Sequence, residues 1–268
     1  MNKLFLLLVA IPLAQSCSTN AVTGRKQLQL FPESTLQQQA VSQYQSFLNE
    51  NKVVSQNNSR DAEMVRRVGG RIASAITSYY KTRTNPVDLS GYKWEFNLVD
   101  NKEVNAWCMP GGKVVVYSGL LPVTQNEAAL AVVLAHEITH AIAQHGNERM
   151  SQVAVAQGLQ VAGNVFTQNK AQANSIFNNV FGPAASVGVL LPNSRKQEYE
   201  ADRFGLIFTA MAGYNPREAV PFWQRMAAAG GGNKPPTFLS SHPADEDRIA
   251  QINKYMPEAL KYYKPMRK

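Results

Sequence analysis

Residues 127–150 read EAALAVVLAHEITHAIAQHGNERM, and this stretch decides the fold. It is apolar around most of a helical circumference, so it predicts one long helix buried in a core. Asn126 precedes the stretch as a potential N-cap, and Glu127 lies in the first turn, where a carboxylate is favoured. A buried charge is costly unless it is compensated, so Glu137 needs a metal ion or a polar partner.

The helix carries the pentapeptide His136-Glu137-Ile138-Thr139-His140. Residues four apart project from one helical face with β-carbons about 5–6 Å apart, so the two imidazoles can each offer a nitrogen to one Zn²⁺ at about 2.0–2.1 Å. Glu137 lies beside the first histidine, where its carboxylate can take a proton from a water that the metal activates. This HExxH arrangement predicts two metal ligands and a general base within one turn. The alternative is a buried histidine pair that is merely structural.

A catalytic zinc needs a third protein ligand while one position stays open for water. An acidic helix is predicted downstream, with the sequence Arg195-Lys196-Gln197-Glu198-Tyr199-Glu200-Ala201-Asp202. Glu198 and Asp202 share one face of this helix, whereas Glu200 points well away from it. His145 is five residues after His140 and falls off the ligand face of a continuous helix, so we interpret it as non-catalytic.

Periodicity organises the rest of the chain. Helices are predicted over residues 34–48, 61–80, 195–211 and 244–255. Alternating apolar residues over 92–98 predict a half-buried strand, and two further strands are expected over 104–109 and 113–117, joined by a Gly-Gly turn. Residues 151–194 are almost without charge and are expected to form an inserted segment of helices and loops.

The N-terminus has the pattern of an export signal. Asn2-Lys3 is a short positive region, and the apolar run that follows is too short to span a bilayer, so residues 1–16 are interpreted as a signal peptide. Small residues before Cys17 resemble a lipoprotein signal, in which cleavage leaves this thiol to be lipidated. The alternative is an ordinary cleaved signal. Residues 17–31 are expected to be a polar tether.

Composition excludes some classes of function. The chain has 268 residues, a formal net charge of +8 and 44% hydrophobic residues, which fits one sizeable globular domain. Its lysines and arginines are scattered and form no aromatic-plus-basic module, so nucleic-acid binding is not expected. With Cys17 lipidated, Cys108 is left without a disulfide partner and is expected to be a small buried hydrophobe.

Further motifs accompany the HExxH helix. They are E-x-E-A-D at 198–202, Asn105-Ala106-Trp107, Pro110-Gly111-Gly112, Gly119-Leu120-Leu121, and Ser241-His242-Pro243 followed by Arg248. Together they resemble the metallopeptidase family of the CAAX prenyl proteases, the HtpX-like proteases and the periplasmic LoiP and BepA lipoproteins. The resemblance runs from about Asn105 to Ile252. The signal pattern and the motif VTGR at 22–25 favour the bacterial LoiP-like branch.

The resemblance implies an α+β fold. In it, a mainly helical gluzincin-type metallopeptidase domain carries a small antiparallel sheet whose edge strand flanks the active-site helix. Residues 32–268 are then a single zinc metallopeptidase domain, with 151–194 inserted. The edge strand, to which a substrate peptide adds by β-augmentation, is implied to include Asn105, Ala106 and Trp107; the alternative is an ordinary paired strand.

The resemblance also implies the roles of the site residues. Glu198 is the third ligand of one Zn²⁺ per chain, and Glu200, the alternative ligand, is otherwise a solvated or salt-bridged carboxylate. Asp202 is expected behind the site, where it holds a ligand histidine in the right tautomer.

Two catalytic residues are implied, Glu137 and His242. His242 either donates to the oxyanion or occupies the open position of the zinc, and the alternative is a loop histidine that packs on Pro243. Arg248 is expected to order the same loop or to bind substrate.

The resemblance therefore implies a zinc-dependent endopeptidase of the bacterial cell envelope. Its substrates would be unfolded or misassembled envelope proteins, and a lipid on Cys17 would hold it on a membrane, facing the periplasm. Ser18 favours the outer membrane over the inner. The alternative function is an envelope chaperone or assembly factor whose zinc site is latent or structural. A further alternative is a lipoprotein in which the HExxH pattern is coincidental.

Overall fold

The computed structural model describes residues 17–83, 87–157, 170–181, 194–230 and 236–266. The signal peptide predicted over residues 1–16 lies outside the described residues. So do 158–169 and 182–193, which belong to the segment that was expected to be inserted.

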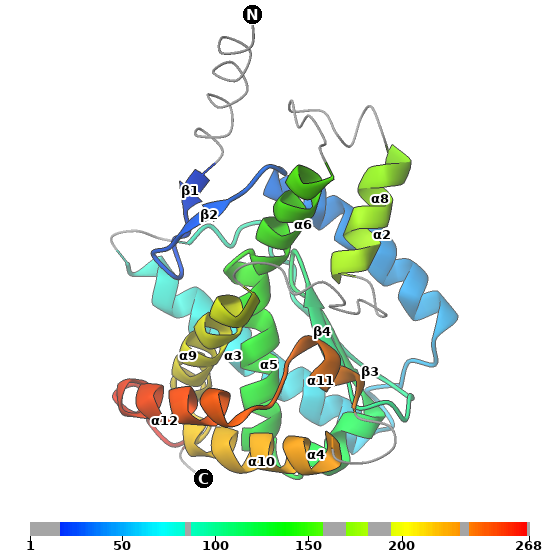
Figure 1. Cartoon of the computed structure of the whole chain (residues 1–268). Coiled ribbons are helices and arrows are strands. Elements are labelled where there is room, and N and C mark those ends of the chain that lie inside the picture. The colour runs from blue at the N-terminus through cyan, green and yellow to red at the C-terminus, as the bar shows by residue number, and fades with distance from the viewer. Residues whose placement is uncertain (1–16, 84–86, 158–169, 182–193, 231–235, 267–268) are drawn as a thin grey trace, which may run out of the picture.

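Helices make up most of the described fold (Figure 1). The longer ones are α2 (Glu33–Glu50), α3 (Arg60–Lys81), α5 (Glu127–Ile142), α6 (His145–Ala156), α8 (Lys170–Phe181), α9 (Ser194–Met211), α10 (Ala219–Gly230) and α12 (Glu246–Leu260). Short helical elements are η1 (Ser118–Leu120), α4 (Leu121–Thr124), η2 (Pro216–Glu218) and α11 (Thr237–Ser241). The strands are β1 (Cys17–Thr19), β2 (Lys26–Leu28), β3 (Glu95–Val99), β4 (Ala106–Met109) and β5 (Lys113–Tyr117). The α+β class is confirmed.

Helix α5 runs through the middle of the molecule, with α3, α9 and the sheet packed around it (Figure 1). Its residues are buried from Ala129 to its last turn, as their apolar character predicts. The predicted N-cap is present, because Asn126 Oδ1 accepts a hydrogen bond from the backbone N–H of Ala129 at 2.8 Å. Helix α9 comes close because residue 205 is glycine: a β-carbon there would lie 3.1 Å from the backbone nitrogen of His136.

The three-stranded sheet has the order β3-β5-β4, so β4 is an edge strand. Strands β4 and β5 form the expected antiparallel hairpin, whose turn needs Gly111 and Gly112 at φ of 79° and 81°. Strands β3 and β5 are parallel, so the expectation of a wholly antiparallel sheet is wrong. The reason is the connection: the chain crosses from β3 to the far edge before the hairpin returns β5 to the middle.

Both faces of β5 are covered, which explains why the whole strand is buried. Val114 and Val116 pack into the larger core around α3, α5 and α9. Val115 and Tyr117 point the other way, into a second core with α2, α6 and α8. The sheet therefore separates two hydrophobic cores, and α5 lies against its first face.

The long helix expected over 127–150 is two helices, α5 and α6. The chain breaks at Gln144, which has a left-handed φ of 54°. The carbonyl of Ala143 accepts side-chain hydrogen bonds from Asn20 Nδ2 at 2.9 Å and from Gln27 Nε2 at 3.1 Å. These partners come from the N-terminal part of the chain, so periodicity within 127–150 could not reveal the break.

Residues 17–31, expected as a tether, fold back onto the domain. Strands β1 and β2 form an antiparallel hairpin, and the polar residues Asn20 and Gln27 are buried because they bond to Ala143. Beyond the hairpin, Leu30 and Phe31 make hydrogen bonds to side chains of α6. Among the described residues, no helix combines the length and the hydropathy that crossing a bilayer would need.

Candidate metal centre and active site

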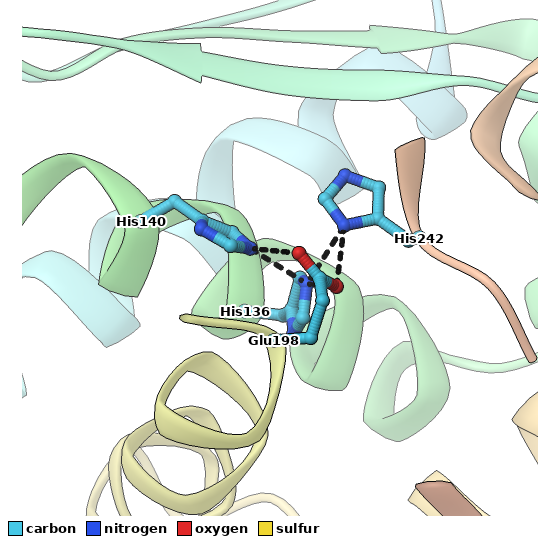
Figure 2. A group of neighbouring side chains, drawn as sticks. All are labelled: His136, His140, Glu198 and His242. Atoms are coloured by element: carbon cyan, nitrogen blue, oxygen red, sulfur yellow. Dashed lines mark hydrogen bonds and ion pairs between the residues drawn. The ribbon is translucent and has the colours of Figure 1, made fainter. Parts of the chain in front are cut away.

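Four buried side chains converge where α5, α9 and the end of α11 meet (Figure 2). His136 and His140 come from α5, and Glu198 comes from the first part of α9. His242 follows α11 directly. One ligand atom from each lies within 4.8 Å of the others, and all four residues are buried. The structure therefore brings together the predicted ligands and the predicted loop histidine.

The distances between the ligand atoms of these four residues fit the coordination shell of zinc. His136 Nε2 lies 3.1 Å from His140 Nε2 and 3.2 Å from His242 Nδ1. Glu198 presents Oε2 at 3.4 Å from His136 Nε2 and Oε1 at 3.3 Å from His140 Nε2. Ligands at about 2.0–2.1 Å from a tetrahedral zinc lie about 3.3 Å from one another. Two imidazoles and a carboxylate therefore form a site suited to one zinc ion, with His242 at the fourth corner.

His136 is held from behind by a buried ion pair. Its Nδ1 lies 3.0 Å from Asp202 Oδ1. Arg248 donates to both oxygens of Asp202, from Nε and Nη2 at 2.8 Å, and stacks over the Trp223 ring with its guanidinium carbon 3.5 Å from the centroid. Asp202 thus lies where the sequence placed it, and it fixes the His136 ring so that Nε2 faces the other ligands.

Arg248 also orders the loop that carries His242. Its Nη1 donates to the carbonyl oxygen of Pro243 at 3.2 Å, and the same nitrogen lies 3.4 Å from Glu198 Oε2. Of the two roles expected for Arg248, ordering this loop is the one that these contacts support.

His145, which was interpreted as non-catalytic and off the ligand face, contacts a ligand. Its Nδ1 lies 2.9 Å from His140 Nδ1, and its Nε2 lies 3.1 Å from Glu200 Oε2. The break at Gln144 turns His145 back toward His140, which a continuous helix would not do. The five-residue spacing gave no signal of this contact, because the break depends on residues of the N-terminal hairpin.

Glu200 lies outside the ligand group, as the helical geometry of 198–202 indicated. It pairs with His145 and with Arg25, whose Nε donates to Glu200 Oε1 at 2.7 Å. The interpretation of Glu200 as a salt-bridged carboxylate therefore agrees with its contacts. Cys17 opens β1 and pairs with Leu28 in the ladder of the hairpin.

Burial and neighbouring charges set the protonation of the ligands. Burial lowers the pKa of His140 well below its ordinary value, so this imidazole is neutral. Burial also opposes protonation of His136, but its hydrogen bonds with Asp202 and Glu198 outweigh this effect and raise the pKa of His136 to about 9. Burial opposes ionisation of Glu198 too, yet His242 and the hydrogen bond with His136 hold its pKa well below the ordinary value. Metal binding therefore requires a proton to leave His136.

Glu137 faces the same space from the ligand helix. Its Oε1 is buried without a hydrogen-bond partner among the described residues and lies 3.4 Å from His242 Nε2. Burial raises the pKa of the Glu137 carboxyl, which moves it toward the range in which a carboxylate works as a general base near neutral pH. An orphaned acceptor beside three metal ligands suits a group that takes a proton from water.

A cavity of about 90 Å³ opens beside these residues. Glu137, His140 and His242 line it from one side, and the predicted substrate-binding residues line it from another: Asn105, Ala106 and Trp107. Among the described strands, β4 pairs with β5 alone, so the cavity lies at the edge of β4 that no described strand occupies. Trp107 also packs edge-to-face on Tyr44 and Phe47, which fits the alternative of an ordinary paired strand.

A buried HExxH helix, a glutamate from a second helix and an open strand beside them define the class of HExxH zinc metallopeptidases. The chain belongs to peptidase family M48, whose sequence pattern matches residues 71–256.

Relatives of the chain occur in mitochondria and in bacteria. It is 36% identical over 172 residues to the mitochondrial metalloendopeptidase OMA1 of Schizosaccharomyces pombe, which covers 64% of this chain and 49% of that protein. It is 28% identical over 259 residues to the mitochondrial metalloendopeptidase OMA1 of Bos taurus, and the match covers 90% of this chain and 46% of that protein. It is 32% identical over 162 residues to the β-barrel assembly-enhancing protease of Yersinia pestis, and the match covers 59% of this chain and 33% of that protein. The chain thus spans half or less of the length of these relatives.

Proposed function

We propose that this protein is a zinc-dependent endopeptidase that hydrolyses peptide bonds in unfolded or extended polypeptides. The observation that carries the proposal is a single cavity lined by Glu137, by the ligand His140 and by the edge strand β4. A substrate segment that adds to β4 through main-chain hydrogen bonds would lie next to the metal group. Relatives that are named metalloendopeptidases support the same chemistry.

The residues divide the reaction between them. A zinc ion held by His136, His140 and Glu198 would supply Lewis-acid chemistry, lowering the pKa of a water molecule toward about 7 and polarising a carbonyl oxygen. Glu137 is placed to accept a proton from water through Oε1, which has no hydrogen-bond partner among the described residues, and to give it to the leaving amine. The low-dielectric surroundings strengthen each of these interactions, because all the groups are buried.

His242 has two successive roles in this proposal. Its Nδ1 lies 2.8 Å from Glu198 Oε2, so the ring fills the fourth corner of the ligand group. If the group holds zinc, a substrate carbonyl would compete with His242 for the place beside the metal, and displacement of the imidazole would require the segment 237–243 to move. The displaced imidazole can then donate to the oxyanion, a contact that is worth about 2.7–4 kcal/mol in other enzymes.

The decisive experiment is the substitution Glu137→Gln. The amide has the shape of the carboxylate but cannot accept the proton, so zinc content should stay at one per chain while cleavage of unfolded casein is lost. Zinc analysis and the casein assay are run on the same preparation. Cleavage at the parent rate would refute the assignment.

A second candidate function is a chaperone or assembly factor of the envelope with a latent or structural zinc site. The observation that favours it is the closed fourth corner, where His242 Nδ1 meets Glu198. His242→Ala separates the two functions. A latent peptidase should still cleave casein at unchanged zinc content, at a rate that reflects both the removed His242 contact with Glu198 and the lost oxyanion donor. A chaperone should cleave nothing in either form and should still suppress aggregation of an unfolded protein.

The bacterial envelope and the lipid anchor belong to the same proposal. The signal pattern before Cys17 and the similarity to a protein named β-barrel assembly-enhancing protease support it, and they make unfolded or misassembled envelope proteins the proposed substrates. Ser18 supports the outer membrane. In a bacterial host, an alkyne-palmitate label should be incorporated by the parent and not by Cys17→Ser, and only the parent should sediment with outer membranes. Equal labelling of both proteins would refute the anchor.

A further inference from the structure

His145 is buried completely and touches the ligand His140, yet it takes no part in the reaction proposed above. On its other side it meets Glu200, and Glu200 receives two N–H groups of Arg25: Nε at 2.7 Å and Nη2 at 3.0 Å. An unbroken path of hydrogen bonds therefore leads from the N-terminal hairpin to the metal group.

The partners along this path decide where the protons lie. His140 turns Nε2 toward Glu198 and His136, and to bind a metal through Nε2 its neutral ring must carry the hydrogen on Nδ1. That hydrogen can be donated to His145 only if Nδ1 of His145 accepts. The hydrogen of His145 is then on Nε2, where it is donated to Glu200 Oε2 at 3.1 Å. Each partner thus selects the tautomer of the next.

Hydrogen bonds within the hairpin turn fix the position of Arg25 at the end of this path. Asn20 Oδ1 accepts hydrogen bonds from the backbone N–H groups of Val22 and Thr23, and Gly24 takes the left-handed φ of 71° that closes the turn. The backbone N–H of Asn20 then donates to the carbonyl of Arg25 at 2.8 Å. The turn is the VTGR motif of the sequence, for which the proposed reaction has no use.

The Arg25 guanidinium joins two helices. Beside its bidentate contact with Glu200 of α9, it makes a second one with Glu148 of α6, through Nη1 at 2.6 Å and Nη2 at 2.7 Å. Bidentate pairs of this kind fix orientation as well as distance. The hairpin also supplies Asn20 and Gln27 to the carbonyl of Ala143 at the break, and it is this break that brings His145 to His140.

We propose that Arg25 is a positioning residue of the metal site, which acts through Glu200 and His145 to hold the His140 ring with Nε2 toward the metal. The inference rests on the metal site of the proposed function and adds a support that no ligand residue provides. It makes the N-terminal hairpin a structural part of the metal centre, although no hairpin residue belongs to the ligand group.

The test compares Arg25→Met with Lys26→Met. Both remove one positive charge from neighbouring positions, but the Lys26 side chain is exposed and lies outside the path. Zinc affinity is measured by competition with a chromogenic chelator, and ligand geometry by the visible absorption of the cobalt-substituted protein. Loss of a group that orients a ligand weakens metal binding about 10–100-fold. We expect this loss and a changed cobalt spectrum for Arg25→Met, and parent values for Lys26→Met. Arg25→Lys keeps the positive charge but cannot make the bidentate guanidinium contacts, so its zinc affinity should be intermediate.

A double-mutant cycle shows whether Arg25 acts along the path or merely through the fold. His145→Phe alone should weaken zinc about 10–100-fold, and adding Arg25→Met to it should weaken zinc no further, because the path is already cut. Losses that multiply would overturn the proposal, since Arg25 would then act through Glu148 or general stability. If Arg25→Met cannot be purified, Glu200→Leu, which has no acceptor for His145 or Arg25, cuts the same path and must show the same loss.

The tautomer itself gives a second readout, which needs neither metal nor activity. The ¹⁵N shifts of the His140 and His145 rings in chelator-treated protein should report hydrogens on Nδ1 and Nε2, respectively. In Arg25→Met this assignment should become mixed, and unchanged shifts together with unchanged zinc affinity would overturn the proposal. A parent protein that binds no zinc would instead refute the proposed function, so the two failures can be told apart.

Discussion

His136 and His140 lie one turn apart on the same helix, but different parts of the molecule hold them. The His136 ring contacts Asp202 of α9, which is bound by Arg248 of α12. The His140 ring contacts His145, and the hydrogen-bonded path behind it ends at Arg25 in the N-terminal hairpin. Behind each ligand histidine there is a carboxylate bound to an arginine. The path behind His140 has one histidine more, His145, and its arginine comes from the N-terminal hairpin.

The difference is one of burial and of chain separation. The side chains of Asp202 and Arg248 are 3% and 2% exposed, whereas those of Arg25 and Glu200 are 11% and 15% exposed. The first pair is part of the main core, and losing either member leaves a buried charge unpaired. The second pair lies closer to solvent, and Arg25 keeps Glu148 if Glu200 is lost. The support of His136 should therefore govern stability, and the support of His140 should adjust the site at smaller cost.

The largest effect is expected for Asp202→Asn. The amide leaves the buried Arg248 without its bidentate carboxylate, which should lower the free energy of unfolding by about 3–5 kcal/mol. Urea unfolding of chelator-treated protein measures it. Asp100→Asn, which breaks an exposed pair with Lys52, is the control and should leave the unfolding midpoint unchanged. An equally small effect for Asp202→Asn would contradict the division drawn above.

A smaller loss is expected for Gly205→Ala, which disturbs both supports because Glu198, Glu200 and Asp202 all lie on α9. The new β-carbon would sit 3.1 Å from the backbone nitrogen of His136, and crowding of this kind costs about 1–3 kcal/mol. Gly70→Ala is the matched control. It lies in α3 with open space around it, so it should stabilise the protein by about 0.5–1 kcal/mol. Unfolding midpoints of the two variants should move in opposite directions.

Glu200→Gln should cost less again, about 1–2 kcal/mol of unfolding free energy, because hydrogen bonds to one ionised group are lost. The urea measurement is made at pH 7 without metal. A loss as large as that of Asp202→Asn would mean that the supports of His136 and His140 contribute equally to stability, contrary to the difference in their burial.

The smallest effect is the pH dependence of that Glu200→Gln difference. Burial acts to raise the pKa of Glu200, but hydrogen bonds from His145 and Arg25 outweigh it, so the pKa lies below its ordinary value of 4.5. The folded state therefore favours the carboxylate, and its contribution is complete above pH 4.5 and lost as the pH falls through the folded pKa. The difference in free energy of unfolding between the parent and Glu200→Gln should stay constant from pH 7 to 5 and become smaller below pH 4.5. A gap that widens in acid would contradict the assigned shift.

The sequence predicted the site partly from local spacing and partly from the family resemblance, which implied the roles of Glu198, His242 and Arg248. Helical periodicity placed His136 and His140 on one face, set Glu198 and Asp202 together, and turned Glu200 away. Strand β5 was predicted with its observed bounds, because a Gly-Gly turn and a run of β-branched residues mark it. Local spacing placed His145 outside the ligand group, where it lies, but did not predict its contact with His140, which depends on the break at Gln144.

The sequence by itself determined the ligand helix, the acidic helix and the kind of metal they suit, because residues within a few positions of one another obey fixed helical geometry. Only the tertiary structure decided the parallel pairing of β3 with β5, the break at Gln144 and the contact of Arg25 with Glu200, which lie 175 residues apart. Such contacts leave no periodic trace, because they depend on which surfaces meet when the chain packs, and here they join the N-terminal hairpin to the helix that binds the metal.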